Sequence, residues 1–136
     1  MQVEVAVLAD YANMAENSKL NVMGMFDRIT APSFPATHAY MVLALRLRIE
    51  WEDRSTTHHI QIALEDADGR VLGGGDGKLV VGPIPPGERS IVSQILPFAN
   101  LEFPRAGEYH FRVSWDGQPK ATIPLTLQLT APGPIG

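Results

Sequence analysis

Apolar and polar residues alternate with a period of two along most of the chain, a pattern typical of β-strands that bury one face. The longest one-sided apolar series runs from Met41 to Trp51 and predicts a long strand. Shorter series predict strands at 3–7, 20–26, 60–64, 109–115 and 123–129, with weaker signals at 78–81 and 90–96. Only residues 12–18 favour a helical turn. The pattern predicts about eight short strands.

Turn-forming residues separate the predicted strands. They include Asp68-Gly69, the glycine run 73–75, the PIPPG segment 83–87, Ala106-Gly107 and Asp116-Gly117. The last pair lies between two strongly alternating segments and gives the clearest hairpin signal. The first strand is predicted to end near Ala9 and the second to begin near Lys19. The polar residues between them are interpreted as a turn, because Asn, Asp and Ser bond neighbouring backbone groups.

A Gly-x-Tyr motif at Gly107 to Tyr109 enters a strand near the end of this β-rich sequence. It resembles the corner motif of immunoglobulin-like folds, in which a buried tyrosine bonds nearby backbone through its hydroxyl. We therefore expect an all-β fold, a single immunoglobulin-like antiparallel β-sandwich of about seven to nine strands. It is predicted to span residues 1–130, and the Pro/Gly-rich residues 131–136 are predicted to form an extended or flexible tail.

Several segments together resemble a family of small bacterial proteins known as a domain of unknown function. They read LADYA (8–12), KLNVMGMFDRI (19–29), FPATHAYMVLALRL (34–47), DADGR (66–70) and GEYHFRV (107–113). The family's opening has ADYA, then Gly-Lys-Leu-Asn, then Gly-x-Phe-Asp. This chain departs from it by having Ser18 before Lys19. The resemblance implies a β-sandwich and no assigned activity.

Composition narrows the classes of partner and compartment. The 136 residues suffice for one domain with a core, and the net charge of −4 is spread along the chain. Without a basic stripe, neither nucleic acid nor an anionic membrane is an expected partner. The chain has no cysteine, shows no secretory leader pattern, and its longest apolar run, Ala39 to Leu45, is too short to cross a bilayer. We expect a cytoplasmic protein.

The histidines do not form a ready metal site in the sequence. His58 and His59 are neighbours on one predicted strand, so their side chains point to opposite faces and cannot chelate one ion. His59 and His110 could meet across strands on an outer face, and the sequence leaves this open.

Two loop motifs lack residues that their chemistry needs. Residues 66–69 begin like a calcium loop, but Val71 stands where that loop needs glycine and Gly77 where it needs glutamate. Residues 73–78 suggest a phosphate loop, but no Ser or Thr follows Lys78. We therefore interpret them as a strand-end turn and as a strand connection or bulge. No catalytic, cofactor-binding or metal-binding residues are predicted, and the protein is expected not to be an enzyme.

A second apolar surface is the strongest functional signal. Opposite the core rows lie five apolar residues, predicted to form one outer patch: Met23, Met25, Tyr40, Val42 and Ala44. Such patches often mark interfaces, and uncharged edge strands also permit strand addition between copies. The protein is thus predicted to be an interaction module that binds copies of itself or another protein. Three alternatives stay open. Residues 83–86 or the tail cover the patch, the protein binds a carbohydrate or other small molecule, or it is an enzyme whose acids or histidines converge in a pocket.

Overall fold

The computed structural model describes residues 1–131, so the predicted tail lies, from residue 132 on, outside the described part. Two short 3₁₀ turns, η1 (Glu16–Ser18) and η2 (Trp51–Asp53), interrupt a chain that is otherwise β-structure and loops. The described strands are β1 (Gln2–Met14), β2 (Leu20–Phe26), β3 (Arg28–Ala31), β4 (Ala36–Ile49), β5 (Thr56–Asp66), β6 (Val71–Val81), β7 (Ser90–Phe103), β8 (Gly107–Trp115) and β9 (Gln118–Leu129).

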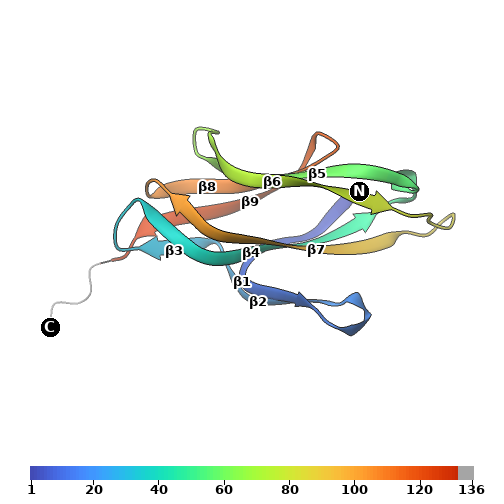
Figure 1. The fold of residues 1–136 in the computed structure, drawn as a ribbon, viewed down its shortest axis with the longest axis horizontal. Coiled ribbons are helices and arrows are strands. Elements are labelled where there is room, and N and C mark those ends of the chain that lie inside the picture. Colours follow the sequence, from blue (N-terminus) through green and yellow to red (C-terminus); the bar gives the residue numbers. More distant parts are fainter. Residues whose placement is uncertain (132–136) are drawn as a thin grey trace.

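The strands form two sheets that pack face to face as a sandwich (Figure 1). A four-stranded sheet has the order β2-β1-β4-β7, and a five-stranded sheet has the order β3-β9-β8-β5-β6. The predicted all-β sandwich is therefore confirmed. One detail of the prediction is wrong: the sheets are not wholly antiparallel, because the short strand β3 runs parallel to β9.

The core lies between the sheets, where the alternating rows predicted from the sequence face each other. In β4 the whole row from Met41 to Ile49 is fully buried, and it packs against rows that include Phe111, Val113 and Leu125. Burying each such large side chain contributes roughly 1.5–3 kcal/mol, so this row contributes strongly to the stability of the fold.

Trp51 was predicted to end the core row of β4 and does not. It lies in the η2 turn, is 37% exposed, and carries the Arg54 guanidinium 3.2 Å from its ring centroid. The chain turns at Glu50, whose side chain and backbone form a reciprocal capping box with Asp53. Because this turn ends the strand, residue 51 leaves the sheet and its inward-facing row.

The predicted tyrosine corner is present at the start of β8. Tyr109 is almost completely buried, and its hydroxyl donates a 2.7 Å hydrogen bond to the backbone carbonyl of Arg105. The predicted turn at Asp116-Gly117 connects β8 to β9, and residues 83–87 form the loop between β6 and β7. The glycines at 73–75, predicted to form a strand connection or a bulge, lie inside β6, and the register of β5 with β6 shifts next to Gly73.

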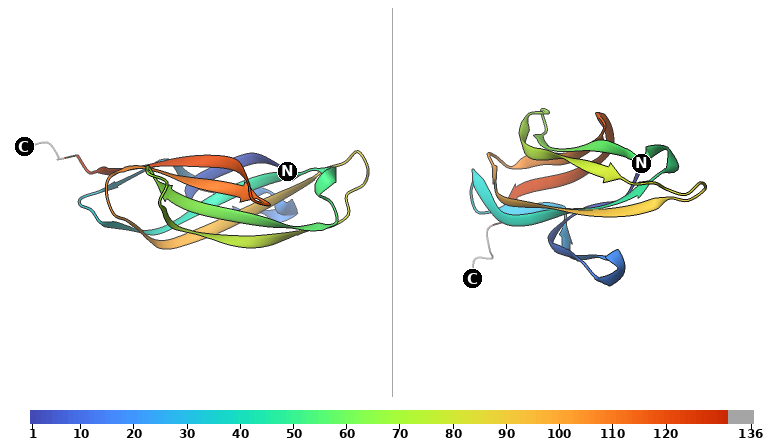
Figure 2. Two further views of the ribbon diagram at one scale, coloured as in Figure 1. Left: turned by 90° about the horizontal axis from the view of Figure 1, so that it is seen from above. Right: turned by 45° about the vertical axis from the view of Figure 1, so that its right-hand side comes forward.

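The first strand is longer than predicted, because the polar segment after Ala9 continues as β-structure. Strand β1 pairs with β4 only as far as Ala9, whereas its pairing with β2 continues to Met14. Beyond Ala9 the two strands therefore form a ribbon, the β1–β2 hairpin, that leaves the sheet on its outer side and extends below the sandwich in the right-hand view of Figure 2. Asp10 lies opposite Gly24 at the point of departure. Gly24 has a φ of +72°, a conformation that favours glycine, and a Cβ there would lie 2.5 Å from an Asp10 carboxylate oxygen.

Candidate interaction surfaces

The outer face of the four-stranded sheet is partly covered by the chain itself. Val42 and Ala44 are fully buried, in a cluster with Ala9 and Ala12 that also contacts Val22 and other partly buried residues. Ala12 and Val22 belong to the β1–β2 hairpin, which forms a third layer over part of this face. The prediction that Val42 and Ala44 lie exposed is therefore wrong. The alternative of cover by the same chain is right, but the covering segment is the hairpin and not residues 83–86.

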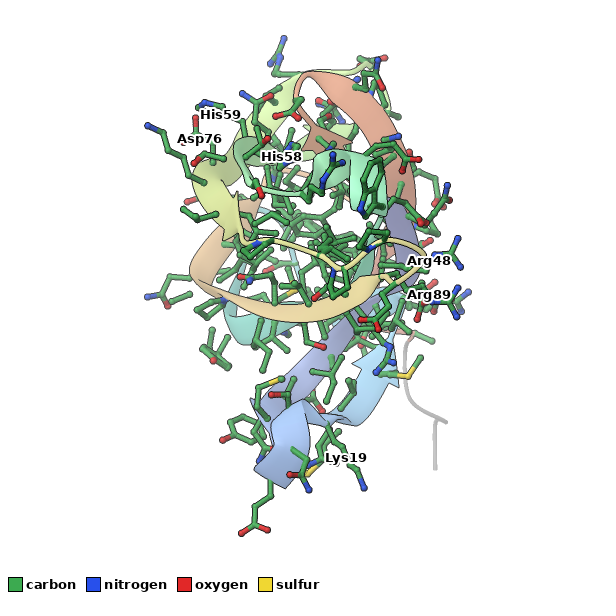
Figure 3. All side chains as sticks on the ribbon, turned by 90° about the vertical axis from the view of Figure 1, so that its right-hand side faces the viewer. Lys19, Arg48, His58, His59, Asp76 and Arg89 are labelled. Carbon is green, nitrogen blue, oxygen red and sulfur yellow. The ribbon has the colours of Figure 1, made fainter. Side chains whose placement is uncertain are left out.

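The other predicted patch residues remain accessible. Met23 is 50% exposed, Met25 is 66% exposed, and Tyr40 lies on β4 with nearly half of its side-chain surface exposed. Tyr11 pairs directly with Met23 across the hairpin and is also exposed. Figure 3 shows the hairpin projecting away from the sandwich, with Lys19 near its far end. We call Tyr11, Met23, Met25 and Tyr40 the hairpin patch.

A cleft opens on the side of the sandwich formed by the edge strands β6 and β7. Its volume is about 290 Å³, and its lining includes Ile60, Ile62, Leu79, Leu96 and Phe98. Three successive inward positions of β6 are glycines, and two of them, Gly75 and Gly77, line the cleft. Those glycines, at 73, 75 and 77, face the core residues Leu64, Ile62 and Ile60 across the β5–β6 ladder. These inward positions of β6, which in other strands carry apolar side chains, therefore have no side chain.

The backbone does not require all of these glycines. At Gly74, between two of them, φ is +143° and a Cβ would lie 2.0 Å from the carbonyl oxygen of Ile62, so glycine is necessary there. A Cβ at Gly75 would meet nothing within 4 Å, and one at Gly77 would make an ordinary contact of 3.9 Å with Ile60. Glycine in a strand often marks a close approach by a ligand or another backbone. The cleft was not predicted, although the period-two spacing of the three glycines is visible in the sequence.

A buried histidine joins β5 to the β8–β9 turn. His58 lies on the core row, as predicted, and its ring stacks on Trp115 with centroids 4.4 Å apart. Its Nε2 donates to the backbone carbonyl of Asp53 over 2.8 Å, and its Nδ1 lies 2.6 Å from a carboxylate oxygen of Asp116. Burial lowers the pKa of His58, but the bonds to Asp116 and Asp53 raise it by more, so the pKa ends above its usual 6.5. The protonated ring can donate at both nitrogens, which suits this position.

Asp116 is held in the charged form by the same contact. The hydrogen bond with His58 lowers the pKa of its carboxyl most, and the backbone N–H of His59 adds a 2.9 Å bond to the other oxygen. Both partners are thus engaged with each other and with backbone, an arrangement that stabilises the loop end of the sandwich.

Two buried acids lie at the other end of β5. Glu65 contacts the guanidinium of Arg112 and lies 3.3 Å from Nε2 of His110. The next residue, Asp66, accepts hydrogen bonds of 2.9 Å from the backbone N–H groups of Asp68 and Arg70. The bond from Arg70 contributes most to lowering the pKa of the Asp66 carboxyl. Residues 66–70 are therefore the predicted strand-end turn.

The histidines that could have met across strands do not meet. His110 is in register with Glu65, six residues along β5 from His59, so the two side chains lie roughly 20 Å apart. Within residues 1–131, no three histidine, aspartate or glutamate side chains gather in an arrangement that could hold a metal ion.

Comparison with known proteins identifies a family for this chain but no activity. A family model described as a family of unknown function (DUF6941) matches residues 4–128. No curated protein matches the chain. In the described residues, no helix is long and apolar enough to span a membrane.

Proposed function

We propose that this chain, which belongs to DUF6941, a family of unknown function, is a non-enzymatic interaction module that self-associates through the hairpin patch. The observation that carries the proposal is the exposure of Tyr11, Met23 and Met25 on a ribbon that projects from the sandwich. Of the residues predicted from the sequence to form the patch, Tyr40 stays in the proposal because it is exposed. Val42 and Ala44 are removed from it, because the hairpin already covers them.

The energetics favour a contact at this surface. Covering a few hundred Å² of apolar surface is worth several kcal/mol at about 25 cal/mol per Å². Methionine side chains adapt to differently shaped partners, which suits a contact surface. The ribbon is anchored from its inner side by Ala12 and Val22, so a partner would meet a surface that is already ordered.

The polar groups support a binding role over a catalytic one. The imidazole of His58 has both nitrogens engaged, and the carboxylates of Asp116 and Asp66 accept hydrogen bonds from groups of the same chain. Each of these groups is thus engaged within the chain, which supports a structural role for them.

The proposal also includes the type of sandwich, the source of the protein and its cellular location. The strand order β1-β4-β7 against β9-β8-β5-β6, together with the corner at Tyr109, supports an immunoglobulin-like sandwich. A bacterial source and a cytoplasmic location follow from the family resemblance and from the cysteine-free composition, and they stay predictions.

The test is the concentration dependence of mass in solution, measured by light scattering coupled to size exclusion. We expect the wild-type protein to associate at micromolar concentration and a Met23→Lys/Met25→Lys variant to form smaller assemblies, because the contact through the hairpin is lost. Leu129→Lys is the matched control, because Leu129 is 57% exposed and lies on β9, outside the patch. Equal association of the patch variant and the control would contradict the proposed role of the hairpin.

A second candidate function is the binding of a small apolar molecule in the β6–β7 cleft. A sugar platform is less well supported, because Arg54 covers one face of Trp51 and Trp115 is buried against His58. The cleft of about 290 Å³ is instead lined mainly by apolar side chains. An apolar fluorescent dye would test this candidate. Its binding should fall when Gly75→Val narrows the cleft, and unchanged dye binding would argue against the site.

A further inference from the structure

The edge strand β6 has an unpaired side. Within the described structure it is hydrogen-bonded to β5 alone, and its eleven residues leave a long row of backbone groups without a strand partner. Proteins usually protect such edges with charges, prolines or bulges, because an open edge can pair with another chain. The register of β6 with β5 shifts only near the start of β6, between Gly73 and Val71, and its two charges, Asp76 and Lys78, are both exposed.

We propose that two copies of the chain pair through β6 in antiparallel orientation, with Gly77 opposite Gly77 of the other copy. The two five-stranded sheets would then form one continuous sheet across a two-fold axis. This interface is separate from the hairpin patch and does not depend on it.

Charge complementarity selects this register. A two-fold axis perpendicular to the sheet keeps the inward faces of both copies on the same side of the joint sheet. Paired residues must then point to the same face, so the axis has to pass through a residue position and the possible registers differ in which residue lies on the axis. With Gly77 on the axis, Asp76 of each copy lies opposite Lys78 of the other. Centring the axis one residue earlier places Asp76 against Asp76, and centring it one residue later places Lys78 against Lys78. Opposite charges directly across a strand pair attract, and like charges repel.

Shape complementarity favours the same register. On the inward face, Leu79 of each copy lies opposite Gly75 of the other, next to the cleft lined by Ile62, Leu96 and other apolar residues. The glycine leaves room there, since a Cβ at Gly75 would meet nothing within 4 Å. A large apolar side chain therefore faces a position without one, twice in the symmetric pair. The proposal thus gives the glycines at 75 and 77, which the fold does not require, a role in close backbone approach.

Charge reversal tests the proposal, with dimerisation measured by sedimentation equilibrium. Every protein in the series carries the Met23→Lys/Met25→Lys pair, so that hairpin contacts do not contribute. Asp76→Lys alone and Lys78→Asp alone each convert both cross-strand pairs into like-charge pairs, and each should weaken dimerisation at least roughly tenfold. The double variant Asp76→Lys/Lys78→Asp reverses both charges, restores the complementarity and should restore the affinity.

A mixing experiment sharpens the test. The two single variants should each stay monomeric at a concentration where an equimolar mixture of them forms a heterodimer, because each supplies the charges that the other lacks. Raising the salt concentration should weaken this heterodimer, since the charges are exposed and screened. Circular dichroism checks that each exposed substitution leaves the fold intact. A monomeric parent protein, single variants that dimerise like the parent, or a mixture that stays monomeric would each overturn the proposal.

Discussion

Two adjacent glycines of β6 should respond in opposite ways to the same substitution. The changes are Gly74→Ala and Gly75→Ala, each of which adds one methyl group to the same strand. At Gly74 the new Cβ would lie 2.0 Å from the carbonyl oxygen of Ile62, and φ is +143°, a conformation that alanine rarely adopts. At Gly75 the new Cβ would meet nothing within 4 Å.

The magnitudes follow from backbone strain and chain entropy. Forcing a residue other than glycine into such a φ region lowers the stability of the folded protein by about 1–3 kcal/mol. The new Cβ would also clash with the carbonyl oxygen of Ile62 unless the paired strands β5 and β6 moved apart. We therefore expect Gly74→Ala to lower the free energy of unfolding by about 2 kcal/mol or more. Gly75→Ala should raise it by about 0.4–1 kcal/mol, because alanine restricts the unfolded chain without strain in the folded one.

Urea unfolding followed by tryptophan fluorescence measures both changes, at protein concentrations where the midpoint does not depend on concentration. For a chain of this size, each kcal/mol corresponds to a shift in Tm of roughly 3–5 °C, so thermal unfolding provides a second measurement. Comparable destabilisation by the two substitutions would refute the reasoning, because it would mean that Gly75 is also constrained by the fold. An unchanged free energy of unfolding in Gly74→Ala would also refute it, because it would mean that the fold does not require glycine at residue 74.

Two further predictions concern polar contacts that fasten the ends of the sandwich. Tyr109→Phe removes the hydroxyl that donates to the Arg105 carbonyl and should destabilise the protein by about 1 kcal/mol in a denaturant titration. The control is Tyr40→Phe, at an exposed tyrosine, which should change stability by less than about 0.5 kcal/mol in the same titration. Because the pKa of His58 is raised in the folded protein, its pairing with Asp116 should contribute fully below about pH 6.5 and be lost as the pH rises through the folded pKa. The free energy of unfolding should therefore fall over that range in the wild type and vary less in Asp116→Asn; an identical pH dependence in both would count against the pair.

The sequence alone was sufficient for the class of fold. Alternation in β4 and β8 predicted which side chains enter the core, and the Gly-x-Tyr motif predicted the buried hydroxyl bond of Tyr109. Asp116-Gly117 predicted its hairpin. These features depend on residues close together in the chain, where the period of two and the chemistry of turns act directly.

Local pattern was not sufficient for the candidate surfaces. Alternation indicates that Val42 and Ala44 point away from the core, but it does not indicate that the β1–β2 hairpin folds back over them. That cover depends on a change of direction at Asp10 and Gly24, two residues that are far apart in sequence and adjacent only in the folded hairpin. Polar residues after Ala9 therefore resembled a turn, although pairing with β2 holds them in a strand.

The β6–β7 cleft was decided in the same way by tertiary structure. The glycines at 73, 75 and 77 were visible in the sequence, but their meaning depends on which strand pairs with β6 and on which side stays unpaired. Side-chain periodicity is a property of one strand, whereas exposure and cavities are properties of how strands from distant parts of the chain are layered. The amino-acid sequence thus determined which faces of the strands are apolar, and only the three-dimensional arrangement decided which of those faces remain free.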